Sequence, residues 1–540
     1  MTSSAPNTTD DRDTPITAPV DFRQYRAPRL NGETFVEPGF DDIEGLLAAN
    51  LQQLDQHDSR WRSMRREARS QLIKDALRYT SVYRDTSWVN PAAAERPIVM
   101  AGHQPSLFHP GVWFKNFSLN SIADQAGATA INLIVDNDVA KGSAIRVPTI
   151  DKTNGLATLT NVAYDDFGGG VPFEQTTVGN LKRFDRFDAD VTKTVRPLVK
   201  DPCVQQLWPH ARAAIDRCGV AGCALAQARH ALEGDIGLKS LEIPLGVVCR
   251  GRAVAEFVLS ILTDLPRFHD CYNDSVEIYR VAHGIRSSAH PVPNLGQQND
   301  WFEAPLWIYG NKTPVRKAAW VRLGDGYLEI SDLGNRNVKI NTTNLSDAID
   351  QLTAAMTPEF KIRPRALLTT MYSRLVLSDL FLHGIGGGKY DQLGDMVIRA
   401  FFEIDPPQFM VMSATIHLPG IQPNDLSSQI RQLKRKIRET HFQGERFQQQ
   451  LGRKSDLAQR KGELLQRIPP RGQRPRWHLE VTDVNQQMSQ ALGGYRNELE
   501  ASLATAQRQS NAQSILESRE HSFCLYPLDY LTETFARLSR

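Results

Sequence analysis

Cysteine is scarce in this chain, with six residues among 540 at irregular spacings. Secreted domains that depend on disulfides carry a denser set, so we expect reduced thiols and a cytoplasmic location. Long hydrophobic runs are also missing, since no stretch approaches the roughly 18 consecutive apolar residues of a membrane-spanning helix. Residues 1–13 are polar and acidic, unlike a secretory signal. Together these absences predict a protein that neither crosses a membrane nor relies on disulfides.

The chain also lacks a large net charge, because its 63 Lys and Arg residues nearly balance its 61 Asp and Glu residues. The balance hides one basic segment: residues 431–476 hold 14 Lys and Arg against 4 Asp and Glu. Aromatic residues do not alternate with the basic ones there, which weighs against nucleic acid as a partner. A solvated helical face is the commonest explanation of such a run; a nucleotide-phosphate site and an RNA contact are the other two.

The composition, 41% hydrophobic and 23% charged, is that of a folded protein, and the length predicts more than one structural unit. Residues 1–20 are rich in Ser, Thr, Asp and Pro without an apolar period, which predicts a disordered tail. We divide the rest into an α/β core at residues 21–423, a coiled-coil helical hairpin at 424–518, and a segment at 519–540 that returns to the core.

Two short apolar runs predict neighbouring parallel strands. Residues 96–102 end in glycine, and residues 130–135 end in Asp136-Asn137-Asp138. The segment 112–126 between them predicts a helix, so the three elements form a βαβ unit, in which ligands bind beyond the carboxyl ends of the strands. We therefore predict a Rossmann-like parallel sheet with both loops at one pocket. Further strands are predicted at residues 241–249 and 408–413, with a hairpin turning at Gly324-Asp325.

After residue 420 the pattern changes to an imperfect heptad repeat. Ile430, Ile437 and Leu451 fall on its a positions, and a second amphipathic run covers residues 488–506. Prolines at 469–475 stop the helix between the two runs. The pattern predicts an antiparallel coiled-coil hairpin, through which a homodimer is a possible assembly.

The loop after the first predicted strand holds the densest group of polar residues. Gly102 at the strand end lets backbone amides approach a phosphate or carboxylate. His103 and His109 can donate hydrogen bonds, and Lys115 adds a positive charge on the next helix. This pattern predicts a site for an anionic substrate; a proline-rich turn with packed aromatic residues is the structural alternative.

Two other groups of residues have a chemical and a structural interpretation. Consecutive glycines at 384–388 can cradle an anion, but they lack the Gly-Lys-Ser/Thr ending of a P-loop, and a tight turn explains them equally well. His210, Cys218, Cys223 and His230 match no common zinc spacing, so we predict no metal site.

Several of these segments together resemble the cysteine-adding enzymes of bacillithiol biosynthesis (the BshC family). The matching segments, in chain order, are Gly102-x-Gln104 with Pro110-Gly111 and Lys115, Asp136-Asn137-Asp138, Tyr272-Asn273 with Tyr279-Arg280 and His283, Arg363-Pro364-Arg365, Gly384 to Gly388, and Arg519 with Tyr526-Pro527. A basic coiled coil precedes the last segment, as in that family. The resemblance covers most of the chain in outline.

The resemblance implies a ligase-like enzyme that joins the carboxyl group of cysteine to an amino group of a small sugar-derived acceptor. The catalytic residues would be His103, Lys115, Asp136 and Asp138, with one of the two aspartates as general base or amine anchor. The substrate-binding residues would be Gly102, Gln104, His109, Asn273, His283, Arg363, Gly386, Gly387 and Gly388. Amide formation needs an activated carboxyl, for which a nucleotide, ATP or ADP, is a candidate cofactor.

Two other functions agree with the same residues. A nucleotidyl- or glycosyl-group transferase would use the same loop chemistry, because that chemistry binds phosphates. A non-catalytic interaction protein would use the coiled coil to bind a partner.

Overall fold

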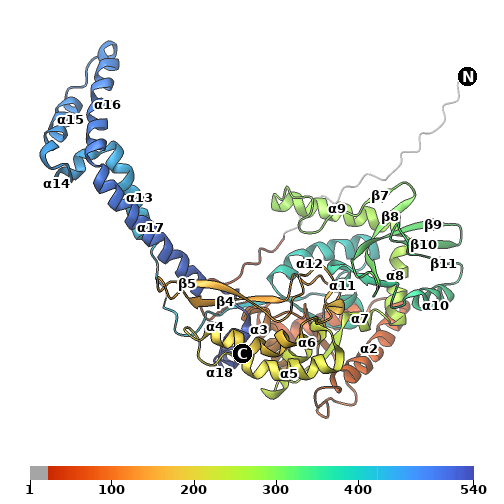
Figure 1. The fold of residues 1–540 in the computed structure, drawn as a ribbon. Helices are drawn as coiled ribbons and strands as arrows, with labels where there is room; N and C mark the ends of the chain where they lie inside the picture. The colour runs from red at the N-terminus through yellow and green to blue at the C-terminus, as the bar shows by residue number, and fades with distance from the viewer. Residues whose placement is uncertain (1–21, 423, 540) are drawn as a thin grey trace, which may run out of the picture.

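The computed structural model describes residues 22–422 and 424–539, and it is a mixed α/β protein (Figure 1). The tail predicted at residues 1–20 lies outside the described residues. A six-stranded sheet, called sheet A here, has the order β1-β14-β13-β2-β3-β6. Its strands are β1 (Glu33–Glu37), β14 (Met410–Thr415), β13 (Leu380–His383), β2 (Ile98–His103), β3 (Thr129–Ile134) and β6 (Leu241–Pro244). All run parallel except β1, which pairs antiparallel with β14 at the edge.

The chain leaves the middle of sheet A in two directions. From β2 it passes through α3 (Pro110–Gln125) to β3, and from β13 through α12 (Ile385–Val397) to β14. Alternate side chains show that the two helices cover opposite faces: Ala101 and Leu382 belong to the apolar core around α3, while Met100 and Phe381 belong to the core around α12. The neighbouring strands β2 and β13 therefore flank a topological switch point, where open α/β sheets bind ligands.

The predicted βαβ unit is present with small shifts of its bounds. β2 is apolar and buried along nearly all its length because both faces of the sheet are covered. His109 caps α3, with its side chain accepting a hydrogen bond from the Gly111 amide, and Pro110 occupies the first turn. The strand expected at residues 241–249 ends earlier, since β6 stops at Pro244 and α7 (Leu245–Val248) follows as one helical turn. That part of the prediction was wrong, because a buried apolar run does not distinguish a strand from a short buried helix.

A second, antiparallel sheet has the order β11-β10-β9-β8-β12, with β7 beside β8. Its strands are β7 (Gln297–Gln298), β8 (Trp301–Tyr309), β9 (Lys317–Gly324), β10 (Tyr327–Ser331), β11 (Asn337–Asn341) and β12 (Lys361–Pro364). The hairpin predicted at Gly324-Asp325 is confirmed as the turn between β9 and β10. A separate hairpin joins β4 (Ala144–Ile150) to β5 (Ala157–Ala163).

Helices cover sheet A, while strands β9, β10 and β11 of the second sheet lie at the edge of the molecule with one face open (Figure 1). The helices are α1 (Ile43–Asp55), α2 (Ser59–Thr80), α4 (Leu181–Val195), α5 (Val204–Cys218), α6 (Ala221–Asp235), α8 (Arg252–Leu262), α9 (Leu265–His283), α10 (Leu345–Ala355), α11 (Ala366–Tyr372) and α18 (Leu528–Leu538). Two large apolar clusters lie on the two faces of sheet A, one including α8 and α9 and the other including α4, α5 and α18. Among the described residues, no helix is both long enough and apolar enough to cross a membrane.

A helical arm projects from this body (Figure 1). It consists of α13 (Ser427–Phe442), α14 (Gln448–Leu451), α15 (Asp456–Gln466), α16 (Arg474–Ala491) and α17 (Gly493–Leu516). α13 packs along α17 near the body, and α15 packs along α16 toward the tip, where a small apolar cluster of its own includes Leu457 and Met488. The first predicted helix is interrupted between residues 443 and 455, where short helical turns replace a continuous helix. After the arm the chain returns to the body and α18 packs against α3.

Candidate active site

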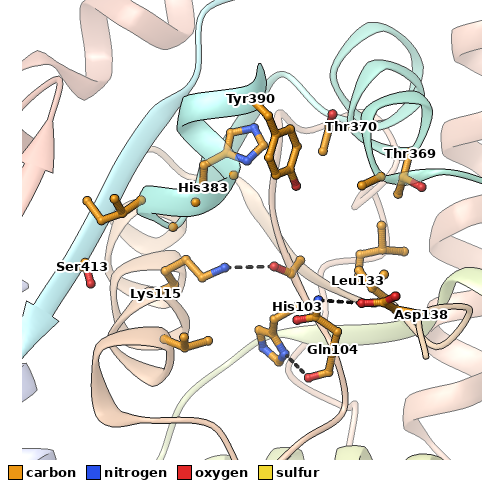
Figure 2. Close-up of a pocket in the computed structure, with 18 of the residues that line it drawn as sticks. His103, Gln104, Lys115, Leu133, Asp138, Thr369, Thr370, His383, Tyr390 and Ser413 are labelled. Carbon is orange, nitrogen blue, oxygen red and sulfur yellow. Dashed lines mark hydrogen bonds between the residues drawn. The ribbon is translucent and has the colours of Figure 1, made fainter. Parts of the chain in front are cut away.

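A cavity of about 600 Å³ opens at the switch point, beyond the carboxyl ends of β2 and β13. Its wall includes residues from β2, α3, the loop after β3, the first turn of α12 and the segment after α17. Figure 2 shows His103 and Gln104 on one side of it, and His383 and Tyr390 on the opposite side. Loops far apart in the sequence therefore converge on one space.

Lys115 is a buried cation in this wall. Its Nζ atom donates a hydrogen bond of 2.9 Å to the carbonyl oxygen of Gly102, the glycine of β2 (Figure 2). Only 4% of the residue is exposed, and burial lowers the pKa of the ammonium group to about 8. Lys115 is therefore still mostly charged at neutral pH, with one hydrogen bond inside the protein and two remaining donors for an anionic ligand.

His103 is held as a neutral imidazole. Burial lowers its pKa well below the ordinary value, and the nearby cations Arg229 and Lys115 act in the same direction. Its Nε2 atom lies 3.2 Å from Oδ1 of Asn116, whose amide nitrogen donates to the carboxylate of Glu233 at 2.6 Å. That carboxylate fixes the amide with its oxygen toward His103, and Nδ1 lies 3.2 Å from the carbonyl oxygen of Gln104, so both ring nitrogens face an acceptor within the protein.

His383 ends β13 as His103 ends β2, but it is backed by a carboxylate. Its Nε2 atom lies 2.9 Å from Oδ2 of Asp391, and Arg374 contacts the same carboxylate oxygen at 2.7 Å. Burial alone would raise the pKa of Asp391, but Arg374 and His383 together lower it below its ordinary value. Burial lowers the pKa of His383. The result is a neutral imidazole that donates from Nε2 to an ionised acid and keeps the lone pair of Nδ1.

The first turn of α12 brings unpaired backbone amides to the same cavity. The helix begins after Gly384, with no side chain capping it, and residues 384–387 line the cavity. A Cβ atom at Gly387 would lie 2.7 Å from Nδ1 of His383, so only glycine leaves that nitrogen accessible. The N-terminus of α3 opens onto the same space, and both helix dipoles favour an anion there.

The loop after β3 contributes the carboxylate of Asp138. Its Oδ2 atom accepts a hydrogen bond of 3.1 Å from Gln104, and Oδ1 lies 3.4 Å from Arg316. Arg316 in turn lies over the ring of Trp307, 4.7 Å from its centroid. Gln104 and Asp138 also line a neighbouring cavity of about 680 Å³, bounded by the β4–β5 hairpin and the loop at residues 165–168. The two cavities therefore share one polar wall.

The segment after the arm closes the remaining side. Arg519 donates a hydrogen bond of 2.7 Å to Ser413 of β14, and it lines the cavity together with Glu520. Burial lowers the pKa of His109 to about 4, against the opposing effect of Glu520, so His109 is neutral and its Nδ1 stays committed to capping α3.

The structure brings eight of the predicted site residues together at the cavity: Gly102, His103, Gln104, His109, Lys115, Asp138, Gly386 and Gly387. It does not bring there Asp136, Asn273, His283, Arg363 or Gly388. Gly388 faces Val411, where a Cβ atom would approach to 2.3 Å, so its role is close packing of α12 on β14.

Asp136 and Arg363 belong to a separate buried cluster of charges. The carboxylate of Asp136 accepts a hydrogen bond of 2.9 Å from the Gly246 amide. Burial and the nearby Glu174 raise the pKa of Asp136 to about 7. Glu174 pairs with Lys361 at 3.1 Å and Arg363 at 3.3 Å, which lower its pKa despite burial. Asp136 points away from the cavity that Asp138 enters, so Asp138 is the better placed of the two aspartates.

Asn273 and His283 hold α9 and the loop that follows it. Asn273 exchanges two hydrogen bonds with the backbone of Leu295, at 3.0 and 2.9 Å. His283 stacks on Tyr279 with ring centroids 4.1 Å apart. Both contacts are structural.

Sequence reasoning missed His383, Asp391 and Arg374, as well as Arg316. The signal for the first was present, because Leu380-Phe381-Leu382-His383-Gly384 is a buried apolar run that ends in histidine and glycine, as the run ending at Gly102-His103 does. The roles of Asp391 and Arg374 depend on burial and contact, which spacing alone does not indicate.

Among the described residues, no group of three or more His, Cys, Asp and Glu side chains is arranged to hold a metal ion. No family model matches the chain, and no curated protein matches it. The assignment of function therefore rests on the residues of the cavity and on the resemblance described above.

Proposed function

We propose that this protein is an enzyme that forms a carbon–nitrogen bond, joining the carboxyl group of cysteine to the amino group of a small sugar-derived acceptor. The observation that carries the proposal is the His383–Asp391 pair, a neutral imidazole backed by an ionised carboxylate, at a cavity that also has a buried lysine and two helix N-termini. In this proposal sheet A is a Rossmann-like core, the arm is a coiled-coil hairpin, and the protein is cytoplasmic.

The residues divide the reaction between them. The acceptor amine attacks the carbonyl carbon of the activated carboxyl; a C–N bond forms and the bond to the phosphate or adenylate leaving group breaks. Nδ1 of His383 takes the proton that the amine nitrogen loses, and Asp391 stabilises the imidazolium that forms. Lys115 and the amides at residues 385–387 stabilise the negative charge that develops on the leaving group. His103, neutral and held between Asn116 and the Gln104 carbonyl, forms part of the wall beside the substrates without adding charge.

A nucleoside triphosphate would supply the leaving group. The amides of the first turn of α12 and the ammonium of Lys115 are the groups that would hold its phosphates, since they are donors without a competing carboxylate among their hydrogen-bond partners. The residues of the chain then orient the two substrates, and His383 supplies the base.

The neighbouring cavity supports a reaction of two substrates. It meets the first cavity at Gln104 and Asp138, and its wall includes Tyr164, Asn161 and Ser106, which suit a polyhydroxylated ring. The carboxylate of Asp138 would bind the acceptor's ammonium group at the boundary. An amine held there faces the first cavity, where the activated carboxyl lies.

The test is turnover by the full chain with labelled cysteine, ATP and glucosamine as the probe amine. We expect ATP consumption coupled to an amide product of the combined mass less one water, detected by mass spectrometry. His383→Asn should lower the turnover number by about 10²–10⁴-fold. His417→Asn, a histidine that does not line the cavity, is the matched control and should leave the rate unchanged.

The main alternative is a nucleotidyl- or glycosyl-group transferase, favoured by the two helix N-termini at one cavity. In the same assay, run in parallel with a nucleotide sugar in place of ATP, it predicts consumption of ATP or of the nucleotide sugar with no cysteine in the product. If cysteine, ATP and the nucleotide sugar all fail to bind, measured by calorimetry, the cavity is not catalytic and the arm is the functional part, as in an interaction protein.

A further inference from the structure

A cavity of about 380 Å³ lies outside the candidate active site, where α2, the loop before α8 and the end of α11 meet. Its volume falls within the range of about 300–1,000 Å³ that small-molecule sites occupy. Among the described residues, none lines both this cavity and either cavity of the candidate active site. A ligand bound here would therefore be distinct from the substrates of the proposed reaction.

One group of side chains in the wall of this cavity is apolar and almost fully buried. It consists of Ala68, Leu72, Ile243, Val248, Ala253 and Leu377, each at most 8% exposed. Transfer of an aliphatic group from water to such surroundings is favourable. This part of the cavity therefore suits an apolar side chain of a ligand.

The start of α8 supplies hydrogen-bond donors for an anion. The helix begins after Gly251, which has no side chain to cap it, and the amides of Arg252 and Ala253 donate to no described residue. Arg250 also lines the cavity and forms no ion pair with a described residue, whereas the Arg252 side chain pairs with Asp350. The helix dipole and the guanidinium group of Arg250 together favour a carboxylate at this end of the cavity.

Glu67 on α2 and Tyr372 at the end of α11 supply groups that suit a cation. Glu67 lines the cavity and forms no ion pair with a described residue, whereas Asp75 is paired with Arg78 at 2.7 Å. Only 5% of Tyr372 is exposed, and its hydroxyl has no hydrogen-bond partner among the described residues. Burial raises the pKa of that hydroxyl, and Glu67 is one of the nearby groups that raise it further. An ammonium group between the carboxylate and the hydroxyl would satisfy both.

We propose that this cavity binds a free α-amino acid with an apolar side chain. The carboxylate of the ligand would bind Arg250 and the amides at the start of α8, its ammonium group would lie between Glu67 and Tyr372, and its side chain would contact the apolar residues. A zwitterion compensates both unpaired charges at once, whereas a ligand with one charge leaves the other uncompensated. The proposal does not depend on the proposed function, since it uses none of the residues assigned there.

The test is an NMR titration that follows the ligand signals of leucine, 3-methylbutylamine and 4-methylpentanoate in the presence of the full chain. The amine is leucine without its carboxylate, and the acid is leucine without its ammonium group. We expect leucine to bind, and each analogue to bind more weakly by about tenfold or more, because each loses one charge-assisted contact.

Two charge variants assign the contacts. Glu67→Gln should weaken the binding of leucine and of the amine by about tenfold and leave the binding of the acid unchanged. Arg250→Gln should weaken the binding of leucine and of the acid and leave the binding of the amine unchanged. Glu277→Gln and Arg286→Gln, which alter the same residue types at exposed positions outside the cavity, are the matched controls and should change no affinity. Glu67 and Arg250 are exposed as well, so all four variants should keep the melting temperature of the wild type.

Three results would overturn the proposal. The first is no binding of leucine, methionine or phenylalanine at millimolar concentration. The second is equal affinity for leucine and its two analogues, because the site then does not recognise a zwitterion. The third is leucine binding that Glu67→Gln and Arg250→Gln leave unchanged, because the amino acid then lies elsewhere in the protein, as in the candidate active site.

Discussion

At the scale of single residues, the two histidines that end neighbouring strands differ because their partners differ. His103 faces two uncharged oxygens, the Asn116 amide and the Gln104 carbonyl, and burial with the nearby cations Arg229 and Lys115 outweighs both and keeps the ring neutral. His383 faces the Asp391 carboxylate at 2.9 Å, which stabilises the imidazolium it becomes after accepting a proton. The same residue type is thus a fixed donor in one place and a base in the other.

The Asp391 carboxylate should be required for the base. In Asp391→Asn the ring tautomer of His383 is no longer fixed, and we expect turnover in the amide-forming assay to fall by about 10²–10⁴-fold. Asp395→Asn is the matched control, because Asp395 contacts Arg374 at 2.7 Å without contacting His383. The ¹⁵N shifts of the ring, measured without substrate, should show proton on Nε2 in the wild type; a proton on Nδ1 would contradict the assignment.

Asp136 should make stability fall as pH rises. Its pKa is raised to about 7 in the folded protein and is near 4 in the unfolded chain, so between these values the folded state binds more protons. The free energy of unfolding therefore decreases as pH rises from about 4 to about 7. Outside that range Asp136 binds the same number of protons in both states and adds no further pH dependence. Urea unfolding at pH 5 and pH 7.5 should show this decrease in the wild type and a smaller one in Asp136→Asn. Equal decreases would contradict the assignment.

At the scale of elements, glycine decides how closely the helices approach sheet A. A Cβ atom at Gly111 would lie 2.3 Å from the carbonyl oxygen of Ala414 on β14, whereas one at Gly386 would meet nothing within 4 Å. The first position sets the distance between α3 and the sheet. The second keeps the start of α12 open toward the cavity.

Gly111→Ala should lower the free energy of unfolding by about 1–3 kcal/mol, because α3 must shift away from β14. Gly386→Ala, the control in the other helix, should be neutral or stabilising by up to about 1 kcal/mol, since alanine restricts the unfolded chain. Urea denaturation of both variants checks the difference. A neutral Gly111→Ala would mean that α3 does not depend on this contact.

The sequence was enough to predict elements whose patterns are local. β2, α3 and β3 follow from apolar periodicity and a proline at the helix start, and the rule for parallel strands then places their loops at one edge. The same reasoning could not place β13 beside β2, because nearly 280 residues separate them and pairing depends on burial of the whole sheet. The His383 side of the cavity was missed for that reason.

Asp136 and Asp138, only two positions apart, also show what the sequence pattern could not predict. Both follow β3, and the pattern gives no reason to prefer one. Only the contacts decide: the Gly246 amide holds Asp136 in one direction and Gln104 meets Asp138 in the other.

At the scale of the whole molecule, the arm is inserted between β14 and the segment that closes the cavity. Its tip has an apolar cluster of its own. The chain enters the tip at Gly444 and leaves it at Leu492, and these two residues lie side by side, since a Cβ atom at Gly444 would lie 3.4 Å from the Leu492 side chain. Replacing residues 443–492 by a short Gly-Ser linker should therefore leave the melting temperature of the body and the binding of ATP unchanged. A loss of either, by scanning calorimetry or titration, would show that the tip supports the body.

The position of Arg519 has a consequence for biosynthesis. A nascent chain that has emerged as far as Thr415 already holds every strand of sheet A, yet it lacks the wall of the cavity that Arg519 and Glu520 supply and the α18 helix that packs on α3. The arm must be translated before that wall exists. A ribosome-bound intermediate would then present a formed sheet with an open site and the apolar surface of α3 uncovered, a state for chaperones to shield until synthesis passes the arm.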